Sequence, residues 1–338
     1  MTLAQDLTVA VKDLAAKAGF TRAAVTGTGP VAGEGLFRDW LARGWCAGMD
    51  YLRRNVAKRF CPELLIPGAR SVICLAASCA PGESKPSEGL VALYARGRDY
   101  HKVLAKRCRR LMDEIRRVES GFTGRAFVDS APIAERSLAA ACGVGWIGRN
   151  GCLYAPGLGS FLLLCEIVCN LPLVPDGPAS SRCGDCDLCV RACPTGAIAG
   201  DGLVDARRCV SCLTVECKGA IDPALWPRMG CRLFGCDACQ LACPLNREVP
   251  AGDAELRGLT GPLGGAGLAE LLAWTADDWD VATRGSAIRR AGYPEFIRNA
   301  VIAAANSGDM SLAQPLRKLL PTRPDLGDLI RWAIERIT

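Results

Sequence analysis

The feature that most constrains this chain is a run of closely spaced cysteines near its middle. Residues 183–194 read CGDCDLCVRACP, which is the spacing C-x2-C-x2-C-x3-C-P. In bacterial ferredoxins, three cysteines of such a run bind one [4Fe-4S] cluster and the fourth binds another. Eleven of the 20 cysteines in the 338 residues lie between Cys183 and Cys243. This enrichment predicts a dedicated metal or redox segment.

A second cysteine array follows in the same segment. Residues 236–243 read CDACQLAC and precede Pro244, so they repeat the C-x2-C-x3-C-P ending without its leading cysteine, which Cys209 can replace. Crossed ligation predicts one cluster on Cys183, Cys186, Cys189 and Cys243, and a second on Cys193, Cys209, Cys236 and Cys239. Zinc is the rival metal, because paired C-x2-C units also form zinc ribbons. Cys212, Cys217 and Cys231 are alternatives to Cys209 alone.

The ends and the apolar runs of the sequence bear on its location. Charged residues interrupt the amphipathic N-terminus, which resembles neither a signal peptide nor a membrane span. The most apolar run, 161–174, contains Glu166 and is shorter than the roughly 18 residues that a spanning helix needs. We therefore expect a cytoplasmic protein with no membrane partner, whose clustered cysteines bind metal rather than form disulfides.

The residues before the cysteine segment combine two periodicities. Helical patterns cover Leu3–Ala18, Val103–Val118 and Ile133–Ala141, whereas the apolar runs Ser71–Ala77 and Phe161–Val168 predict buried strands. Helices that alternate with buried strands predict an α/β domain.

Composition divides the chain into three predicted domains. A stretch rich in Pro and Gly separates the α/β domain from the cysteine segment, and several short helical patterns follow that segment. The predicted domains are an α/β domain at 1–175, a ferredoxin-like domain with two clusters at 176–250 and a helical domain at 251–338. Two one-electron centres joined to a larger domain indicate a reductase rather than a bare electron carrier.

Charge is uneven along the chain. The formal net charge is +6, and residues 96–117 hold nine basic and three acidic residues. Such a stripe is what a polyanion would contact, although a solvated helix face has the same composition.

The α/β part lacks G-x-G-x-x-G, Walker and G-x-S-x-G motifs, so nucleotide cofactors are poorly supported. Asp129 instead follows a predicted strand and precedes a helix and a glycine-rich turn. Strand ends of this kind often hold active-site groups. A helix N-cap is the structural alternative for this residue.

Several linked segments resemble the epoxyqueuosine reductase family. They are YARGRDYH at 94–101, VDSAPIAER at 128–136, GVGWIGRNG at 143–151, CGDCDLCVRACPTGAI at 183–198, DARRCVSCLTVE at 205–216, FGCDACQLACPLN at 234–246 and RGSAIRRAGYPEFIRNA at 284–300. They occur in the family's order and span nearly the whole chain.

The resemblance implies a cofactor and a reaction. Base-off cobalamin would lie in the α/β domain with its cobalt near the first cluster, and in reduced form it would open the epoxide of epoxyqueuosine in a tRNA anticodon. The product would be queuosine and water, so the reaction would take two electrons and two protons. The resemblance also implies a HEAT-like tail that binds tRNA. We expect a monomer that receives electrons from a low-potential donor such as flavodoxin or ferredoxin.

The resemblance also assigns site residues. Asp129 would be the proton donor, and burial in an apolar pocket would favour its protonated form. Cobalamin contacts would come from Arg59, Asp129, Arg136, Gly148, Asn150, Leu153 and Ser160. Substrate contacts would come from Tyr100, His101, Arg289, Arg290 and Arg298.

Two departures from the family concern substrate contact. The family often has tyrosine at Cys212 and tryptophan at Leu245. Two alternative functions stay open on the sequence: a related corrinoid iron-sulfur reductase acting on a small molecule, and a ferredoxin-type electron carrier. The carrier would need no corrin, and neither alternative requires a basic RNA-binding surface.

Overall fold

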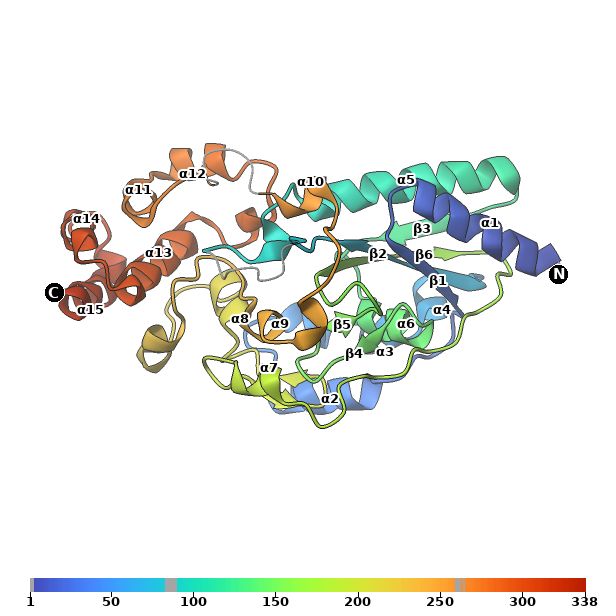
Figure 1. The fold of residues 1–338 in the computed structure, drawn as a ribbon, viewed down its shortest axis with the longest axis horizontal. Coiled ribbons are helices and arrows are strands. Elements are labelled where there is room, and N and C mark those ends of the chain that lie inside the picture. Colours follow the sequence, from blue (N-terminus) through green and yellow to red (C-terminus); the bar gives the residue numbers. More distant parts are fainter. Residues whose placement is uncertain (1–2, 83–89, 259–262, 264) are drawn as a thin grey trace.

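The computed structural model describes residues 1–338 except 1–2, 83–89, 259–262 and 264. A four-stranded sheet of order β1-β2-β6-β3 organises the first half (Figure 1). Its strands are β1 (Arg22–Thr26), β2 (Ser71–Ser78), β3 (Gly124–Phe127) and β6 (Leu162–Cys169), and each neighbouring pair is antiparallel. The predicted strands are thus present in β2 and β6, whose apolar runs form the two central strands.

Helices cover both faces of this sheet (Figure 1). On one face, α1 (Leu3–Lys17) and α5 (Tyr100–Val118) pack over a core that contains Ile73 and Ile167. On the other face, α6 (Glu135–Ala141) packs over Val72 and Val168. Adjacent strand residues therefore serve opposite cores, as the pleat requires.

The prediction of a layered domain of helices and strands is confirmed, but its strand directions did not follow from the sequence. The general placement of active sites at the carboxyl ends of parallel strands does not apply to an antiparallel sheet. Asp129 nevertheless lies just beyond the end of β3. The smaller elements of this half are α2 (Glu34–Ala42), η1 (Asp50–Arg53), α3 (Val56–Phe60), α4 (Pro62–Leu65), η2 (Leu93–Ala95), β4 (Trp146–Ile147) and β5 (Leu153–Tyr154).

The cysteine segment has only short elements, as its Gly and Pro content predicts. They are α7 (Leu188–Arg191), β7 (Ile198–Gly200), β8 (Leu203–Val204), α8 (Val210–Val215), η3 (Pro223–Arg228), α9 (Ala238–Leu241) and η4 (Pro244–Asn246). The helices α7 and α9 each start within one cysteine array and pack against each other.

The C-terminal part is helical, as predicted. Its elements are α10 (Ala254–Arg257), α11 (Leu268–Ala273), α12 (Ala276–Ala282), η6 (Ala287–Arg290), α13 (Tyr293–Ser307), η7 (Met310–Leu312), α14 (Ala313–Leu319), η8 (Pro324–Leu326) and α15 (Gly327–Ile337). The central helix α13 is buried continuously from Phe296 to Ala305, and one hydrophobic core joins it to α8. Among the described residues, no helix has the length and apolar character that crossing a membrane requires.

Candidate functional site

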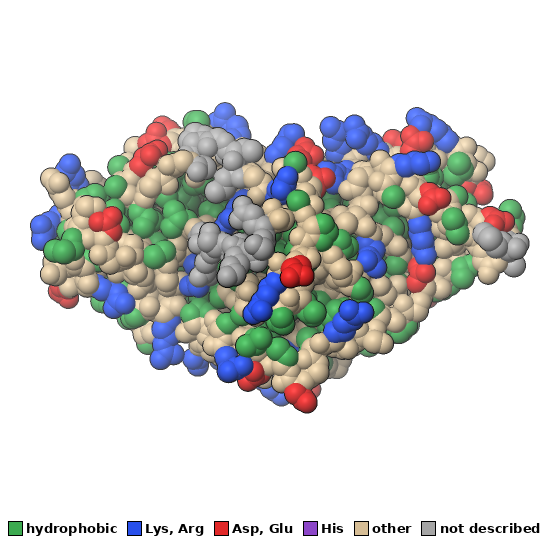
Figure 2. All heavy atoms as spheres, viewed as in Figure 1, with side chains coloured by type: hydrophobic (Ala, Val, Ile, Leu, Met, Phe, Trp, Pro, Cys, Tyr) green, Lys and Arg blue, Asp and Glu red, His purple; other side chains and the backbone are tan. Residues whose placement is uncertain are grey.

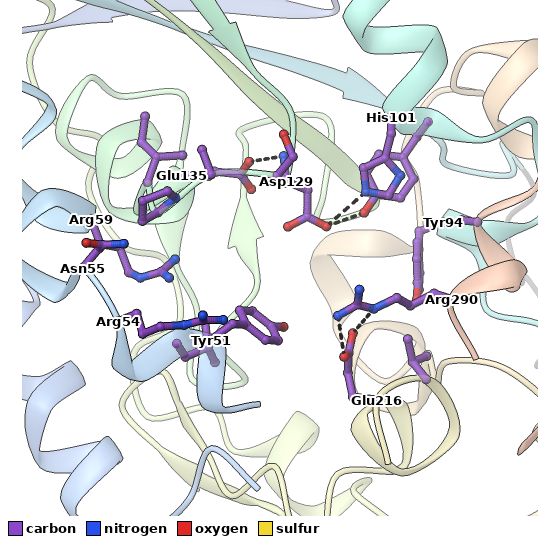
Figure 3. Close-up of a pocket in the computed structure, with 18 of the residues that line it drawn as sticks. Tyr51, Arg54, Asn55, Arg59, Tyr94, His101, Asp129, Glu135, Glu216 and Arg290 are labelled. Carbon is purple, nitrogen blue, oxygen red and sulfur yellow. Dashed lines mark hydrogen bonds and ion pairs between the residues drawn. The ribbon is translucent and has the colours of Figure 1, made fainter. Parts of the chain in front are cut away.

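A cavity of about 760 Å³ lies where the three parts of the chain meet. Its walls come from η1 and α3, from the start of α5, from the loop between β3 and α6, from the end of α8 and from η6 (Figure 3). Asp129, Tyr100, His101, Arg59 and Arg290 all line this cavity. Residues that lie far apart in the sequence and were predicted separately are thus brought together.

Asp129 points toward the first turn of α5 (Figure 3). Tyr100 donates its hydroxyl to Asp129 Oδ2 over 2.5 Å, and His101 Nε2 lies 3.6 Å from the same oxygen. Asp99 caps α5 by accepting the His101 backbone N–H at 3.1 Å, and its Oδ1 also lies 2.8 Å from His101 Nδ1. The sequence Asp99-Tyr100-His101 therefore starts the helix and aims two proton-bearing side chains at Asp129.

The backbone of Asp129 is in the left-handed region, with φ of 48°. This conformation costs a residue other than glycine about 1 kcal/mol and needs support from its surroundings. Glu135 Oε1 supplies that support by accepting the Asp129 N–H at 2.8 Å. The N-cap of α6 is Ala134, so the interpretation of Asp129 as a helix cap is wrong.

The protonation state of Asp129 also differs from the expectation. Burial opposes its charge, but hydrogen bonding from His101 and Tyr100 outweighs burial and lowers the pKa of Asp129. Attraction to Asp129, with a further contribution from Asp99, raises the pKa of His101 despite its burial. Apolar burial therefore does not keep a proton on Asp129, and at neutral pH the proton of this pair is on His101.

Two further features of the cavity carry charge. Arg290 forms a two-pronged ion pair with Glu216, at 2.9 and 2.8 Å, across the cavity from Asp129 (Figure 3). Arg59 has a buried Nε with no hydrogen-bond partner within the described part of the chain. An unpaired buried donor in a large cavity is what a polar ligand group would satisfy.

The structure separates the three arginines predicted to contact substrate. Arg290 lines the cavity, whereas Arg289 pairs on the outside with Asp280 at 2.6 Å. Arg298 is only 3% exposed and donates to the carbonyl oxygens of Leu213, Cys217 and Gly219. Its prediction as a substrate contact is wrong, because the guanidinium is used to join α13 to the segment that ends α8.

The basic stripe is resolved into two classes of side chain. Arg98, Arg107, Arg116 and Arg117 form ion pairs with nearby carboxylates. Within the described residues, four exposed side chains of α5 form no ion pair, and we call them the α5 basic face: Lys102, Lys106, Arg109 and Arg110. Figure 2 shows Lys and Arg side chains along the edge of the molecule over α5.

Most of the predicted cobalamin contacts lie away from this cavity. Apart from Arg59 and Asp129, they do not belong to its described lining. Ser160 donates to Gln240 Oε1 at 2.9 Å, and a side chain at Gly148 would meet the Tyr154 ring at 2.7 Å. Arg136 donates to the Gly151 carbonyl oxygen, and Leu153 is buried in the core beneath α6.

Asn150 lies beside the cysteines. Its Nδ2 donates to Tyr154 Oη at 3.0 Å, and it lines a second cavity, of about 80 Å³. That cavity is lined by the whole first cysteine set: Cys183, Cys186, Cys189 and Cys243. Within the described residues, no three His, Cys, Asp or Glu side chains converge on a single metal ion. Thiols arranged around a cavity suit a multi-atom cluster better than the compact tetrahedral site of zinc.

The second cysteine set lies nearer to Asp129. Cys209, Cys193 and Cys239 are electrostatic neighbours, and burial raises the pKa of the Cys209 thiol. Cys209 directly precedes α8, whose C-terminal residues Val215 and Glu216 form part of the large cavity. The expectation that the first set adjoins the cofactor is therefore not met, since the second set is connected to the cavity wall.

Sequence reasoning missed Glu135, Glu216 and Tyr51, which all line the cavity. Glu135 stands inside the segment VDSAPIAER, of which only Asp129 and Arg136 were selected. Its position at the start of α6, next to an acid in a tight turn, was the available signal. Tyr51 comes from η1, where no motif marked it.

Comparisons with known proteins agree with this arrangement. Residues 59–130 match the family model described as "Epoxyqueuosine reductase QueG, DUF1730", and residues 182–246 match a 4Fe-4S double cluster binding domain. An epoxyqueuosine reductase of Pseudomonas aeruginosa is 38% identical over 98% of this chain and 94% of its own length. The Escherichia coli epoxyqueuosine reductase is also 38% identical, over 96% of this chain and 88% of its own.

Solved structures agree as well. The epoxyqueuosine reductase of Streptococcus thermophilus superposes with a TM-score of 0.90 at 27% identity, over 98% of this chain and 90% of that one. An epoxyqueuosine reductase crystallised with an epoxyqueuosine-modified tRNA-Tyr stem loop gives a TM-score of 0.81 at 25% identity, over 98% of this chain and 99% of that one. Sequence and structure together show that this chain belongs to the epoxyqueuosine reductase family.

Proposed function

We propose that this protein reduces the epoxide of epoxyqueuosine in a tRNA anticodon to the alkene of queuosine. The overall change takes two electrons and two protons: two C–O bonds break, a C=C π bond and two O–H bonds form, and water leaves. The observation that carries the proposal is Asp129, which contacts Tyr100 and His101 in a cavity whose wall continues into the second cysteine set. The names of the full-length relatives support the same reaction.

The cysteines are proposed to bind two [4Fe-4S] clusters in the crossed pattern given by their spacing. Proximity within each set supports this, as does the electrostatic contact between Cys189 of the first set and Cys239 of the second. Two adjacent clusters would pass electrons singly from a reduced flavodoxin or ferredoxin toward the cavity.

The large cavity fits a cofactor such as cobalamin in size and in chemistry. Its volume and the unpaired Nε of Arg59 support a bulky ligand that carries polar groups, and we propose Arg59 as one contact. Cobalamin bound here would supply a low-potential electron pair. We propose the base-off form without a histidine ligand, because the one histidine is held between Asp99 and Asp129.

The residues of the chain would handle the first proton. A departing oxygen that takes a proton from the Asp129 site leaves more easily, which is general acid catalysis. His101, whose pKa is raised between two carboxylates, would carry the proton that reloads Asp129. Tyr100 donates its own hydrogen bond to Oδ2 and thereby fixes the carboxylate toward the cavity.

Substrate binding would use surfaces next to the cavity. The α5 basic face begins one residue after His101, so phosphates that it binds would lie near the cavity. We also propose that the helical C-terminal part acts as a HEAT-like surface for the anticodon stem, with Arg290 at the cavity edge. Turning the modified base out of the loop would place it over the cavity.

The test is an anaerobic assay with reconstituted clusters and cobalamin, a low-potential reductant and tRNA that carries epoxyqueuosine. Nucleoside mass spectrometry should show a product lighter by one oxygen atom, and omission of either cobalamin or reductant should abolish it. Lack of conversion by fully loaded protein would refute the proposed function.

A further inference from the structure

A second carboxyl group lies behind Asp129 in the same cavity. Glu135 is the first residue of α6, lines the cavity, and accepts the Asp129 N–H through Oε1 at 2.8 Å (Figure 3). This hydrogen bond needs one carboxyl oxygen only. The other oxygen can hold a proton without disturbing the support that Glu135 gives to the Asp129 turn.

The surroundings of Glu135 come from four elements. Arg59 faces it from α3, Tyr100 and His101 from α5, Arg136 from its own helix, and Asp129 from the loop; Glu166 of β6 lies beneath. Arg136 directs its guanidinium to the Gly151 carbonyl oxygen instead of forming an ion pair with Glu135. Burial, followed by the negative charge of Asp129, raises the pKa of Glu135 to about 7.

The reaction requires a second proton. The Asp129 and His101 pair accounts for one of the two protons that the departing oxygen receives. Among the other acids of the described lining, Glu216 is engaged by Arg290, and burial raises the pKa of the cavity tyrosines, which makes them weaker acids. Glu135 is the remaining carboxyl group on the wall that holds Asp129.

We propose that Glu135 donates the second proton of the epoxide reduction and, through its other oxygen, holds Asp129 in its left-handed turn. The inference rests on the proposed function. Asp129 protonates the oxygen as the first C–O bond breaks, Glu135 supplies the proton with which that oxygen leaves as water, and the low-potential donor supplies both electrons. Solvent then returns one proton to Glu135 and one to His101.

The test compares Glu135→Gln with Glu135→Ala in single-turnover reactions across pH. Glutamine keeps an oxygen that accepts the Asp129 N–H but carries no exchangeable acid proton. We expect a loss of about 10- to 100-fold for Glu135→Gln at acidic pH, together with loss of the decline that wild-type activity shows as pH rises through about 7. Glu135→Ala, which also removes the hydrogen bond, should be slower still.

Glu34→Gln is the matched control, since Glu34 also opens a helix but pairs with Arg38 on the surface. Its rate and pH profile should equal those of wild type. A Glu135→Gln rate within twofold of wild type, with the same pH profile, would overturn the role of Glu135. Failure of wild type to convert the tRNA would instead refute the proposed function.

A measurement on wild-type protein keeps the inference testable if the variants fold poorly. Infrared difference spectra across pH should show a protonated carboxyl band that titrates with a midpoint near 7. This band should persist in Asp129→Asn. Its absence from folded, fully loaded protein would also overturn the inference.

Discussion

The buried carboxyl group of Glu166 gives a prediction about stability that is independent of catalysis. Glu166 lies on β6 opposite Cys74 of β2 and Phe127 of β3, is 0% exposed, and has no hydrogen-bond partner for either oxygen in the described structure. Burial, and next the negative charge of Glu135, raise the pKa of Glu166 well above 4.5. In the folded protein this side chain is therefore neutral.

The magnitude follows from proton linkage. Between the pKa of an unfolded glutamate and that of the folded protein, the folded state binds one more proton than the unfolded state. The free energy of unfolding therefore falls as pH rises, by about 1.4 kcal/mol per pH unit from this residue. From about pH 5.5 to about pH 7.5 the loss is about 2.7 kcal/mol, provided that both values lie below the folded pKa. Glu166→Gln cannot ionise and should lack this contribution.

The assay is urea denaturation of anaerobically prepared holoprotein at both pH values, for wild type and Glu166→Gln. The difference in unfolding free energy between the two proteins should change by about 2 to 3 kcal/mol between the two pH values, since the other ionisable groups are common to both. A constant difference would mean that Glu166 does not take up its proton on folding. That result would refute the assignment of a neutral buried carboxyl.

Three further predictions concern packing, clusters and substrate. Arg298→Ala should destabilise the protein by about 3 kcal/mol or more, because buried carbonyl oxygens lose their donor, and thermal unfolding would reveal an unchanged midpoint if this is wrong. Cys243→Ser and Cys209→Ser should each remove a different cluster, so iron content and electron paramagnetic resonance should show two distinct residual signals; identical spectra would contradict the crossed assignment. Neutralising the α5 basic face should flatten the salt dependence of tRNA binding by about one unit of slope for each phosphate that the variant no longer neutralises, whereas an unchanged slope would exclude this face.

Local patterns in the sequence were sufficient for much of the fold. The apolar runs of β2 and β6 and the periodicity of α5 gave these elements to within a few residues. Strand direction was not predictable, because the order β1-β2-β6-β3 depends on contacts between distant segments. A pattern within one strand does not encode those contacts.

The candidate site divided in a similar way. Asp129, Tyr100 and His101 were found because each lies in a recognisable segment, and the structure brings them into contact. The charge states were not predictable, since two hydrogen-bonding neighbours outweigh the burial of Asp129. Arg298 resembled a phosphate contact in sequence because nothing local showed that distant carbonyl oxygens surround it.

The central claim is that this chain reduces epoxyqueuosine in tRNA with a proton delivered at Asp129. The most direct test compares wild type and Asp129→Asn at equal cluster and cobalamin content, with epoxyqueuosine-containing tRNA followed by nucleoside mass spectrometry in a single turnover. Wild type should form queuosine, and Asp129→Asn should retain both cofactors while conversion falls by about 100-fold or more. Equal conversion by the two proteins, or no conversion by wild type, would contradict the claim.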